Sequence, residues 1–166
     1  VGGTGGYHIQ QLDSALEYPS NVYFQAELSG IPHSILFLAN GKDAQVIGYS
    51  ELFDNGEYFC LDEYCYHGAV SVFNMPFQQE LAEAIRAIVV ETELCGLCAM
   101  DIILNANGFH VLEINPRPSP SFELHQIKGN LFYWHLQACS GKLPKDLPHP
   151  RWSRAHAVVH APYEIC

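Results

Sequence analysis

Short apolar runs alternate with turn-forming sequences along much of this chain. Residues 34–39 and 44–49 are two such runs, and Asn40-Gly41 between them supplies the positive φ that a tight hairpin needs. Residues 21–39 as a whole are expected to be strand, with a break at residues 29–32. The first part of the chain is therefore predicted to contain antiparallel strands joined by short turns.

Two later stretches have the spacing of amphipathic helices. Between Pro76 and Gly96, apolar residues recur every three or four positions from Phe77 onward, which predicts a helix that begins near residue 77. A second helix is predicted over residues 122–139, and Ser140-Gly141 is expected to end it.

A last strand is predicted over residues 155–161. Several strands with only two helices predict an α+β fold, in which a mainly antiparallel sheet has flanking helices. The chain has 166 residues, of which 48% are hydrophobic, and this is enough for one core. We expect a single domain over residues 1–166, without internal repeats.

The chain carries a formal net charge of −10 and contains eight Lys and Arg residues in total. Nucleic acids and anionic membranes are bound through Lys and Arg, so neither is an expected partner. No apolar run reaches the length that spans a bilayer, and the glycine-rich start is unlike a signal peptide. We therefore expect a cytoplasmic protein.

Cys95-Gly96-Leu97-Cys98 has the C-x-x-C spacing of zinc and redox sites. A structural zinc site usually needs a second close pair, and four residues separate Cys60 from Cys65. Cys98 also begins an apolar strand, where a free thiol behaves as a small hydrophobic side chain. Free thiols are the favoured interpretation, with zinc binding and a disulfide as alternatives.

The most informative residues lie on a predicted hairpin over residues 98–117, which reverses at Asn-Ala-Asn-Gly. Side chains alternate along a strand, so Glu113 and Asn115 are expected on one face. Leu112 and Ile114 are expected to point into the core from the other face.

Asp101 lies on the outgoing strand of this hairpin, at about the height of Glu113. Asp101, Glu113 and Asn115 can therefore converge, and carboxylate and amide oxygens are ligands that Mg²⁺ prefers. Arg117 follows between two prolines, which hold it in an extended segment, and its planar fork suits a phosphoryl or carboxylate group. The alternative is that these side chains are only the solvated face of a hairpin.

A glycine cluster, Gly2-Gly3-Thr4-Gly5-Gly6, opens the chain. Glycines leave backbone N–H groups unobstructed, so such a loop can close over a phosphate chain. No Gly-Lys-Ser/Thr follows, which excludes a Walker loop, and no strand precedes the cluster in this chain, which argues against the dinucleotide fingerprint. A flexible tail is the alternative interpretation.

Taken in order, these motifs resemble the ATP-grasp superfamily, and in particular its carboxylate–amine ligases. The resemblance equates residues 1–9 with a glycine-rich flap loop, residues 22–30 with an adenine-binding hinge, and residues 98–117 with a metal-binding hairpin. It also implies a partial ATP-grasp domain, the carboxy-terminal half of an enzyme whose amino-terminal half is missing. Such a fragment is expected to be inactive alone.

The resemblance implies ATP and Mg²⁺ (or Mn²⁺) as cofactors, and small-molecule carboxylate and amine substrates as partners. The implied reaction activates the carboxylate as an acyl-phosphate, which an amine then attacks to give an amide. The implied ligands are the backbone of Gly3, Thr4, Gly5 and Gly6 for the β- and γ-phosphates, Gln25 for the adenine amino group, the backbone near Ala26 and Leu28 for the adenine edge, Asp101, Glu113 and Asn115 for the metal, and Arg117 for the transferring phosphoryl group or the acyl-phosphate.

Two features depart from the family pattern. Ile31-Pro32-His33 stands where many relatives have a Glu for the ribose hydroxyls, and the family's two phosphate-binding lysines would lie upstream of Val1. A non-catalytic nucleotide-binding or regulatory module is therefore an alternative function, and so is a metal-binding domain that needs no nucleotide. His125 is a further candidate for a residue that faces the substrate.

Overall fold

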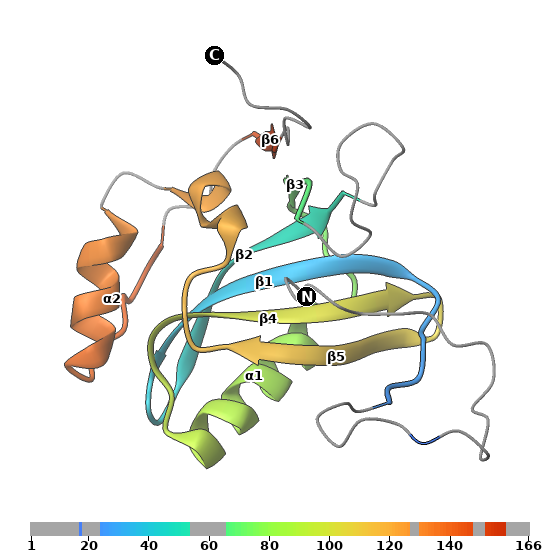
Figure 1. Cartoon of the computed structure of the whole chain (residues 1–166). Helices are drawn as coiled ribbons and strands as arrows, with labels where there is room; N and C mark the ends of the chain where they lie inside the picture. The colour runs from blue at the N-terminus through green and yellow to red at the C-terminus, as the bar shows by residue number, and fades with distance from the viewer. Residues whose placement is uncertain (1–16, 18–23, 54–65, 127–129, 148–151, 159–166) are drawn as a thin grey trace.

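One six-stranded sheet runs through the part of the chain that the structure describes (Figure 1). This computed structural model describes residues 17, 24–53, 66–126, 130–147 and 152–158. The strands follow the order β5-β4-β1-β2-β3-β6, and every neighbouring pair is antiparallel, which confirms the α+β fold with a mainly antiparallel sheet. The strands are β1 Ile31–Asn40, β2 Ala44–Leu52, β3 Gly68–Val72, β4 Cys95–Asn105, β5 Gly108–Asn115 and β6 Ala155–Ala157.

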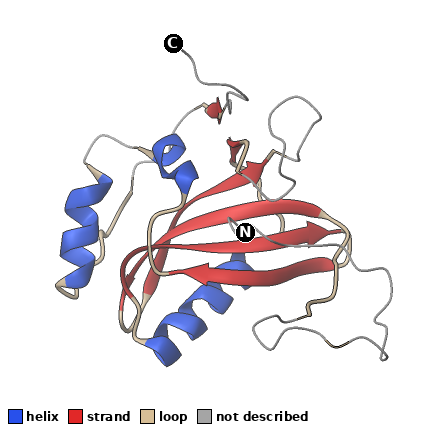
Figure 2. Cartoon of the chain, in the orientation of Figure 1, coloured by secondary structure: helices blue, strands red, loops and turns tan. Residues whose placement is uncertain are grey.

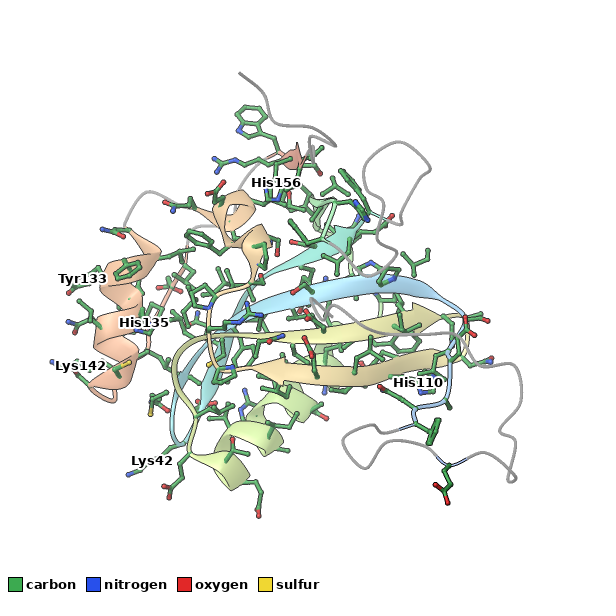
Figure 3. The ribbon with its side chains drawn as sticks, viewed as in Figure 1. Lys42, His110, Tyr133, His135, Lys142 and His156 are labelled. Atoms are coloured by element: carbon green, nitrogen blue, oxygen red, sulfur yellow. The ribbon has the colours of Figure 1, made fainter. Side chains whose placement is uncertain are left out.

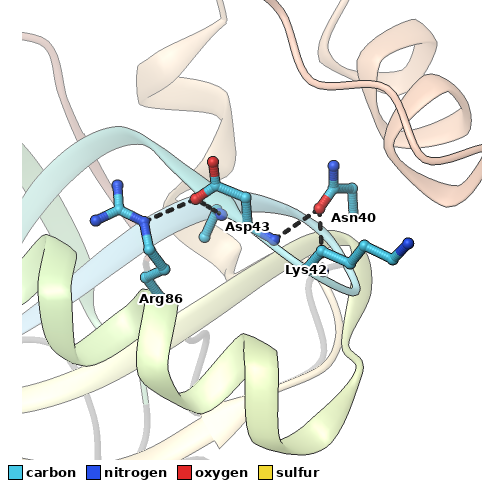
Figure 4. Close-up of polar contacts among 5 residues, drawn as sticks. Asn40, Lys42, Asp43 and Arg86 are labelled. Carbon is cyan, nitrogen blue, oxygen red and sulfur yellow. Dashed lines mark hydrogen bonds and ion pairs between the residues drawn. The ribbon is translucent and has the colours of Figure 1, made fainter.

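The turn between β1 and β2 has the Asn-Gly chemistry that the sequence predicts. Gly41 adopts a φ of 81°, and Asn40 Oδ1 accepts hydrogen bonds from the backbone N–H groups of Lys42 (3.1 Å) and Asp43 (2.8 Å) (Figure 4). Asp43 also accepts a 2.8 Å hydrogen bond from Nε of Arg86, which lies on the following helix. These contacts fix the hairpin, although an ion pair so exposed contributes little to stability.

Helix α1 (Gln78–Thr92) covers one face of the sheet with its apolar side (Figure 2). Its bounds confirm the helix predicted between Pro76 and Gly96. Complete burial of such aliphatic side chains contributes about 1.5–3 kcal/mol each, so this layer is a main source of stability. The buried residues of the layer are Leu81, Ile85 and Val89 of α1, Ile35, Phe37 and Ala39 of β1, Cys98, Met100 and Ile102 of β4, and Met75.

Helix α2 (Leu131–Cys139) packs on the opposite face, where the alternate residues of β1 and β4 point. Leu131 and Ala138 are its buried positions. His135 points from α2 toward the start of β4 (Figure 3), and its Nδ1 accepts a 2.9 Å hydrogen bond from the backbone N–H of Leu97. The candidate site lies further along β4 on this same face.

The continuous helix predicted over residues 122–139 is wrong. Pro120–His125 form a short 3-10 helix, η1, and α2 begins only at Leu131. Asn130 has a φ of 25°, and its side chain accepts a 3.0 Å hydrogen bond from the backbone N–H of Phe132. This capping contact starts a new helix, because it satisfies a donor that a continuing helix would pair internally. Residues 127–129 lie outside the described residues.

Three strand expectations also change. Residues 24–29 are irregular, and β1 begins at Ile31, within the break predicted at residues 29–32, so no strand precedes this break among residues 24–29. β3 is absent from the sequence prediction, because its five small residues show little of the pattern of a half-buried strand. The last predicted strand is present as β6, and residues 159–161 lie outside the described residues.

Among the described residues, no helix has the length and apolar character needed to cross a lipid bilayer.

Candidate functional site

β4 and β5 form the predicted hairpin, which carries three oxygen-bearing side chains. Asp101 and Glu113 are direct partners across the two strands. Asn115 lies two residues further along β5, and its Nδ2 donates hydrogen bonds to Asp101 Oδ2 (3.0 Å) and to Glu113 Oε1 (2.9 Å). The three side chains, hereafter the acidic cluster, therefore converge, while their role as metal ligands stays a prediction.

A β-bulge in β5 lies next to the acidic cluster. Glu113 pairs with Asp101, whereas the next residue of β4, Ile102, pairs with Val111. Leu112, which lies between Val111 and Glu113, therefore has no partner on β4. Phe109 and Ile114 lie five positions apart yet both pack on the α1 side, as the extra residue allows. The expectation that Leu112 points into the core beside Ile114 is wrong, because Leu112 is half-buried and belongs to neither apolar cluster.

The electrostatics of the acidic cluster favour a cation. Burial raises the pKa of the Asp101 carboxyl above its ordinary value, and the Glu113 carboxylate adds to this rise. Two like charges that are partly removed from water gain little from one amide, whereas a divalent cation would compensate both. Two carboxylates and one amide are also the donor set that suits a hard cation such as Mg²⁺ or Mn²⁺.

Ser34 of β1 is a neighbour of the cluster that sequence reasoning missed. It is the β1 partner of Asp101, and only 2% of it is exposed. Its hydroxyl is close enough to Asp101 to oppose the rise in the pKa of that carboxyl, yet it makes no aligned hydrogen bond with any described residue. A buried hydroxyl without an aligned partner, beside two carboxylates, fits a site that gains a ligand.

Arg117 follows the end of β5 and is exposed. Its Nη1 donates a 3.2 Å hydrogen bond to the carbonyl oxygen of Pro118. Arg117 lies two residues beyond Asn115, and an exposed guanidinium is accessible to anions from solvent. The structure thus leaves Arg117 available for the predicted role, which stays a prediction.

The segment equated with a hinge is irregular over its described part, residues 24–30. It is attached to the end of β4: Asn105 Nδ2 donates a 3.4 Å hydrogen bond to the carbonyl of Ser29, and a Cβ on Gly30 would lie 2.5 Å from the carbonyl oxygen of Leu104. Leu104 is three residues from Asp101, or roughly 10 Å along the strand. The segment therefore meets the sheet near the acidic cluster but not at it.

The residues implied for nucleotide binding are only partly described. Gln25 and Ala26 are exposed and Leu28 is half-buried, and among the described residues no hydrogen bond joins these three to the acidic cluster. Their contact with a nucleotide stays a prediction. The glycine-cluster residues, Gly3, Thr4, Gly5 and Gly6, lie outside the described residues.

His125 of η1 is buried against β2, with its Nε2 2.8 Å from Ser50 Oγ. Burial lowers the pKa of His125 to about 4, with a further contribution from Arg154, so the ring is neutral at pH 7. It lines a cavity of about 230 Å³ together with Gly48 and Ser71, among others. A packing role for His125 is evident, and contact with a substrate stays a prediction.

The described cysteines Cys95, Cys98 and Cys139 are free thiols, in agreement with the favoured interpretation. Within the described ranges, no group of three or more His, Cys, Asp or Glu side chains is arranged to hold a metal ion, while Cys60, Cys65 and Cys166 lie outside these ranges. The candidate metal site is of a different kind, since it combines two carboxylates with an amide. Burial raises the pKa of Cys98 to about 11 and keeps its thiol protonated.

Residues 1–121 match the sequence profile of a family described as ATP-grasp domain, and this match covers well over half of the chain. The chain belongs to the ATP-grasp family. The matched residues extend from the glycine cluster through the β4–β5 hairpin to Arg117, so the resemblance drawn from the motifs is confirmed at the level of the family. That this ATP-grasp chain is a carboxy-terminal half stays a prediction.

Several solved structures have a similar fold. One is urea carboxylase from Kluyveromyces lactis (TM-score 0.63, 13% identity, covering 76% of this chain and 12% of that chain). A second is L-amino acid ligase from Bacillus licheniformis (TM-score 0.56, 13% identity, 80% and 34%). A third is N5-carboxyaminoimidazole synthetase from Staphylococcus aureus in complex with ADP (TM-score 0.54, 17% identity, 71% and 31%). The ATP-grasp chain thus spans between 12% and 34% of the length of these proteins, and the similarity establishes the fold.

Proposed function

We propose that this ATP-grasp chain is part of an ATP- and Mg²⁺-dependent carboxylate–amine ligase, which forms an amide through an acyl-phosphate. The observation that carries the proposal is the convergence of Asp101, Glu113 and Asn115 on one hairpin of a chain from this family. Further support comes from similar folds, of which one belongs to an L-amino acid ligase and another to a synthetase in complex with ADP. Mn²⁺ is the alternative cation.

The acidic cluster is proposed to hold the cation that accompanies the nucleotide. Bound there, the cation would neutralise negative charge on the phosphates of ATP. Asn115 now directs Nδ2 at both carboxylates, so it would turn its amide to offer Oδ1 and leave the carboxylate oxygens free. Arg117 would stabilise the transferring phosphoryl group or the acyl-phosphate through its guanidinium.

The adenine is proposed to lie at the hinge segment, which meets β4 roughly 10 Å from Asp101. An extended nucleotide could then reach from the hinge to the acidic cluster. The residues assigned to it are the side chain of Gln25 and the backbone near Ala26 and Leu28 for the adenine, and the backbone N–H groups of Gly3, Thr4, Gly5 and Gly6 for the β- and γ-phosphates.

The proposed reaction needs positioning and charge stabilisation more than a protein nucleophile. An oxygen of the carboxylate substrate attacks the γ-phosphorus of ATP, and ADP leaves. The amine substrate then attacks the acyl carbon, inorganic phosphate leaves, and the amine nitrogen loses a proton. Small-molecule carboxylates and amines are therefore the proposed partners.

Isothermal titration of Mg²⁺ into the protein, with and without a non-hydrolysable ATP analogue, tests this proposal. Mg²⁺ should bind more tightly when the analogue is present, because carboxylates and phosphates then share the cation. Glu113→Gln should weaken this binding by about tenfold or more, since it removes a charged ligand. Glu91→Gln, which changes an exposed carboxylate on α1, should leave it unchanged.

Each other outcome of the titration has a defined meaning. Equal Mg²⁺ affinity with and without the analogue would indicate a metal-binding domain that does not use a nucleotide. Binding of the analogue without any contribution from Mg²⁺ would indicate a nucleotide-binding module. Equal losses in Glu113→Gln and Glu91→Gln would contradict the assignment of the acidic cluster.

A further inference from the structure

A row of polar residues crosses the sheet at the level of Asp101. The pairings between neighbouring strands place Glu113, Asp101, Ser34, Ser50 and Ser71 side by side, on β5, β4, β1, β2 and β3. Hydroxyl groups in the middle of a buried sheet cost free energy unless they form hydrogen bonds. Each serine of this row therefore needs a partner.

Two of the three serines have one. Ser50 Oγ lies 2.8 Å from His125 Nε2, and Ser71 Oγ accepts a 2.8 Å hydrogen bond from the backbone N–H of Arg154. Ser34 is equally buried, but its hydroxyl makes no aligned hydrogen bond within the described part of the chain. The unsatisfied serine is thus the one that lies beside the acidic cluster.

The geometry makes the Asp101 carboxylate the natural acceptor for Ser34. The two residues are direct partners on adjacent strands, where opposite Cα atoms lie about 4.5–5.5 Å apart. Asp101 Oδ2 already accepts from Asn115, so Oδ1 is the oxygen left for a second donor or for a cation.

We propose that Ser34 is a positioning residue of the metal site, whose hydroxyl donates a hydrogen bond to the Asp101 carboxylate and holds it in the orientation that a divalent cation requires. The inference rests on the proposed function, since it takes the acidic cluster as the ligand set. Ser34 acts through Asp101, so its removal weakens cation binding without removing a ligand. Outer-sphere partners of this kind change metal affinity by roughly 10–100-fold.

The test uses Mn²⁺ and ADP as probes and follows free Mn²⁺ by electron paramagnetic resonance. Ser34→Ala should weaken Mn²⁺ binding about tenfold, at the lower end of that range. Without metal, its affinity for ADP and its melting temperature should both be unchanged, because the Ser34 hydroxyl forms no aligned hydrogen bond with any described residue of the metal-free protein. Ser34→Thr keeps the hydroxyl and should bind Mn²⁺ close to the wild-type affinity.

Ser50→Ala is the matched control, because it removes a serine of the same row whose hydroxyl already has a hydrogen-bond partner. It loses the hydrogen bond to His125, so its melting temperature should fall by about 2–4 °C. Its Mn²⁺ affinity should stay at the wild-type value. The two alanine variants thus separate stability from metal binding in opposite ways.

Wild-type affinity in Ser34→Ala would overturn the inference, and so would an equal loss in Ser34→Ala and Ser50→Ala, which would indicate a general packing effect. Weak binding in Ser34→Thr as well as Ser34→Ala would also overturn it, provided that both variants melt at the wild-type temperature. Failure of the wild-type protein to bind Mn²⁺, with or without ADP, would instead contradict the proposed function itself.

Discussion

The carboxyl of Asp101 is half-buried beside Glu113, and burial raises its pKa above the ordinary value. With a raised pKa in the folded state, ionisation of this group opposes folding. The opposition is absent below the pKa of the unfolded chain and grows as the pH rises through the folded-state pKa. Charges that are kept at such a cost often serve a function. At the scale of the residue, the charge of Asp101 is therefore expected to lower stability when no cation is bound and to raise it when one is.

Asp101→Asn should stabilise the protein in the absence of divalent cations, because a neutral amide has no charge to desolvate. A rise in melting temperature of roughly 2–4 °C corresponds to about 1 kcal/mol in a domain of this size. The same variant should lose the stabilisation that Mg²⁺ gives to the wild type. Thermal unfolding with EDTA and with Mg²⁺ measures both effects.

Asp43→Asn provides the control for this experiment. Asp43 is an exposed carboxylate that pairs with Arg86, so its neutralisation should change the melting temperature little and leave the response to Mg²⁺ intact. An unchanged Mg²⁺ response in Asp101→Asn would exclude Asp101 as a ligand.

His125 has a lowered pKa of about 4, so its contribution to stability has a defined pH dependence. The contribution of His125 to stability is fully present above the pKa that histidine has in the unfolded chain, about 6.5, and it is lost as the pH falls toward 4. From pH 7 to pH 5 this residue should cost the wild type about 2 kcal/mol in free energy of unfolding. His125→Gln should lack that part of the pH dependence.

Urea unfolding at pH 7 and pH 5 measures this difference. His110→Gln is the control, because His110 is exposed on β5, and it should keep the pH dependence of the wild type. Equal pH dependence in the wild type and in His125→Gln would show that protonation of His125 does not limit stability.

At the scale of elements, what could be predicted is what is local in sequence. The β4–β5 hairpin has its turn and both strands within a short segment, so simple alternation brings Asp101, Glu113 and Asn115 together. The bulge at Leu112 escapes that rule, because nothing in the local pattern marks the extra residue. The proximity of Ser34 depends on the register between β1 and β4, which only the folded sheet defines.

The contact between η1 and β2 is another feature that no local pattern reveals. A Cβ at Gly48 would overlap the ring of His125, so the short helix can dock only where β2 has no side chain. The helix predicted over residues 122–139 does not indicate that His125 packs against Gly48, since it treats these residues as one continuous helix. The break before Asn130 lets η1 turn its histidine toward the sheet.

Gly48→Ala should destabilise the protein by about 1–3 kcal/mol, because the added methyl group displaces the His125 ring. In a His125→Ala background, the same substitution should cost clearly less, because the space is then open. A double-mutant cycle by urea unfolding gives the coupling between the two residues. Additive free energies would mean that the two side chains do not compete for the same space.

At the scale of the whole molecule, the sheet separates a packing face from the face that carries the candidate site. α1 closes one side with a continuous apolar layer, while the other side carries α2, η1 and the acidic cluster. The α+β architecture follows from the pattern of apolar runs. Family membership rests on the matched sequence as a whole.

The most direct test of the central claim is to locate Mn²⁺ on the protein by nuclear magnetic resonance, with an ATP analogue present. Paramagnetic broadening falls steeply with distance, so the amide signals of Asp101, Glu113 and Asn115 should broaden first. Signals from the outer face of α1 and from β6 should stay sharp at the same Mn²⁺ concentration. Broadening that is centred elsewhere, or none at all, would contradict the claim that these three side chains hold the metal.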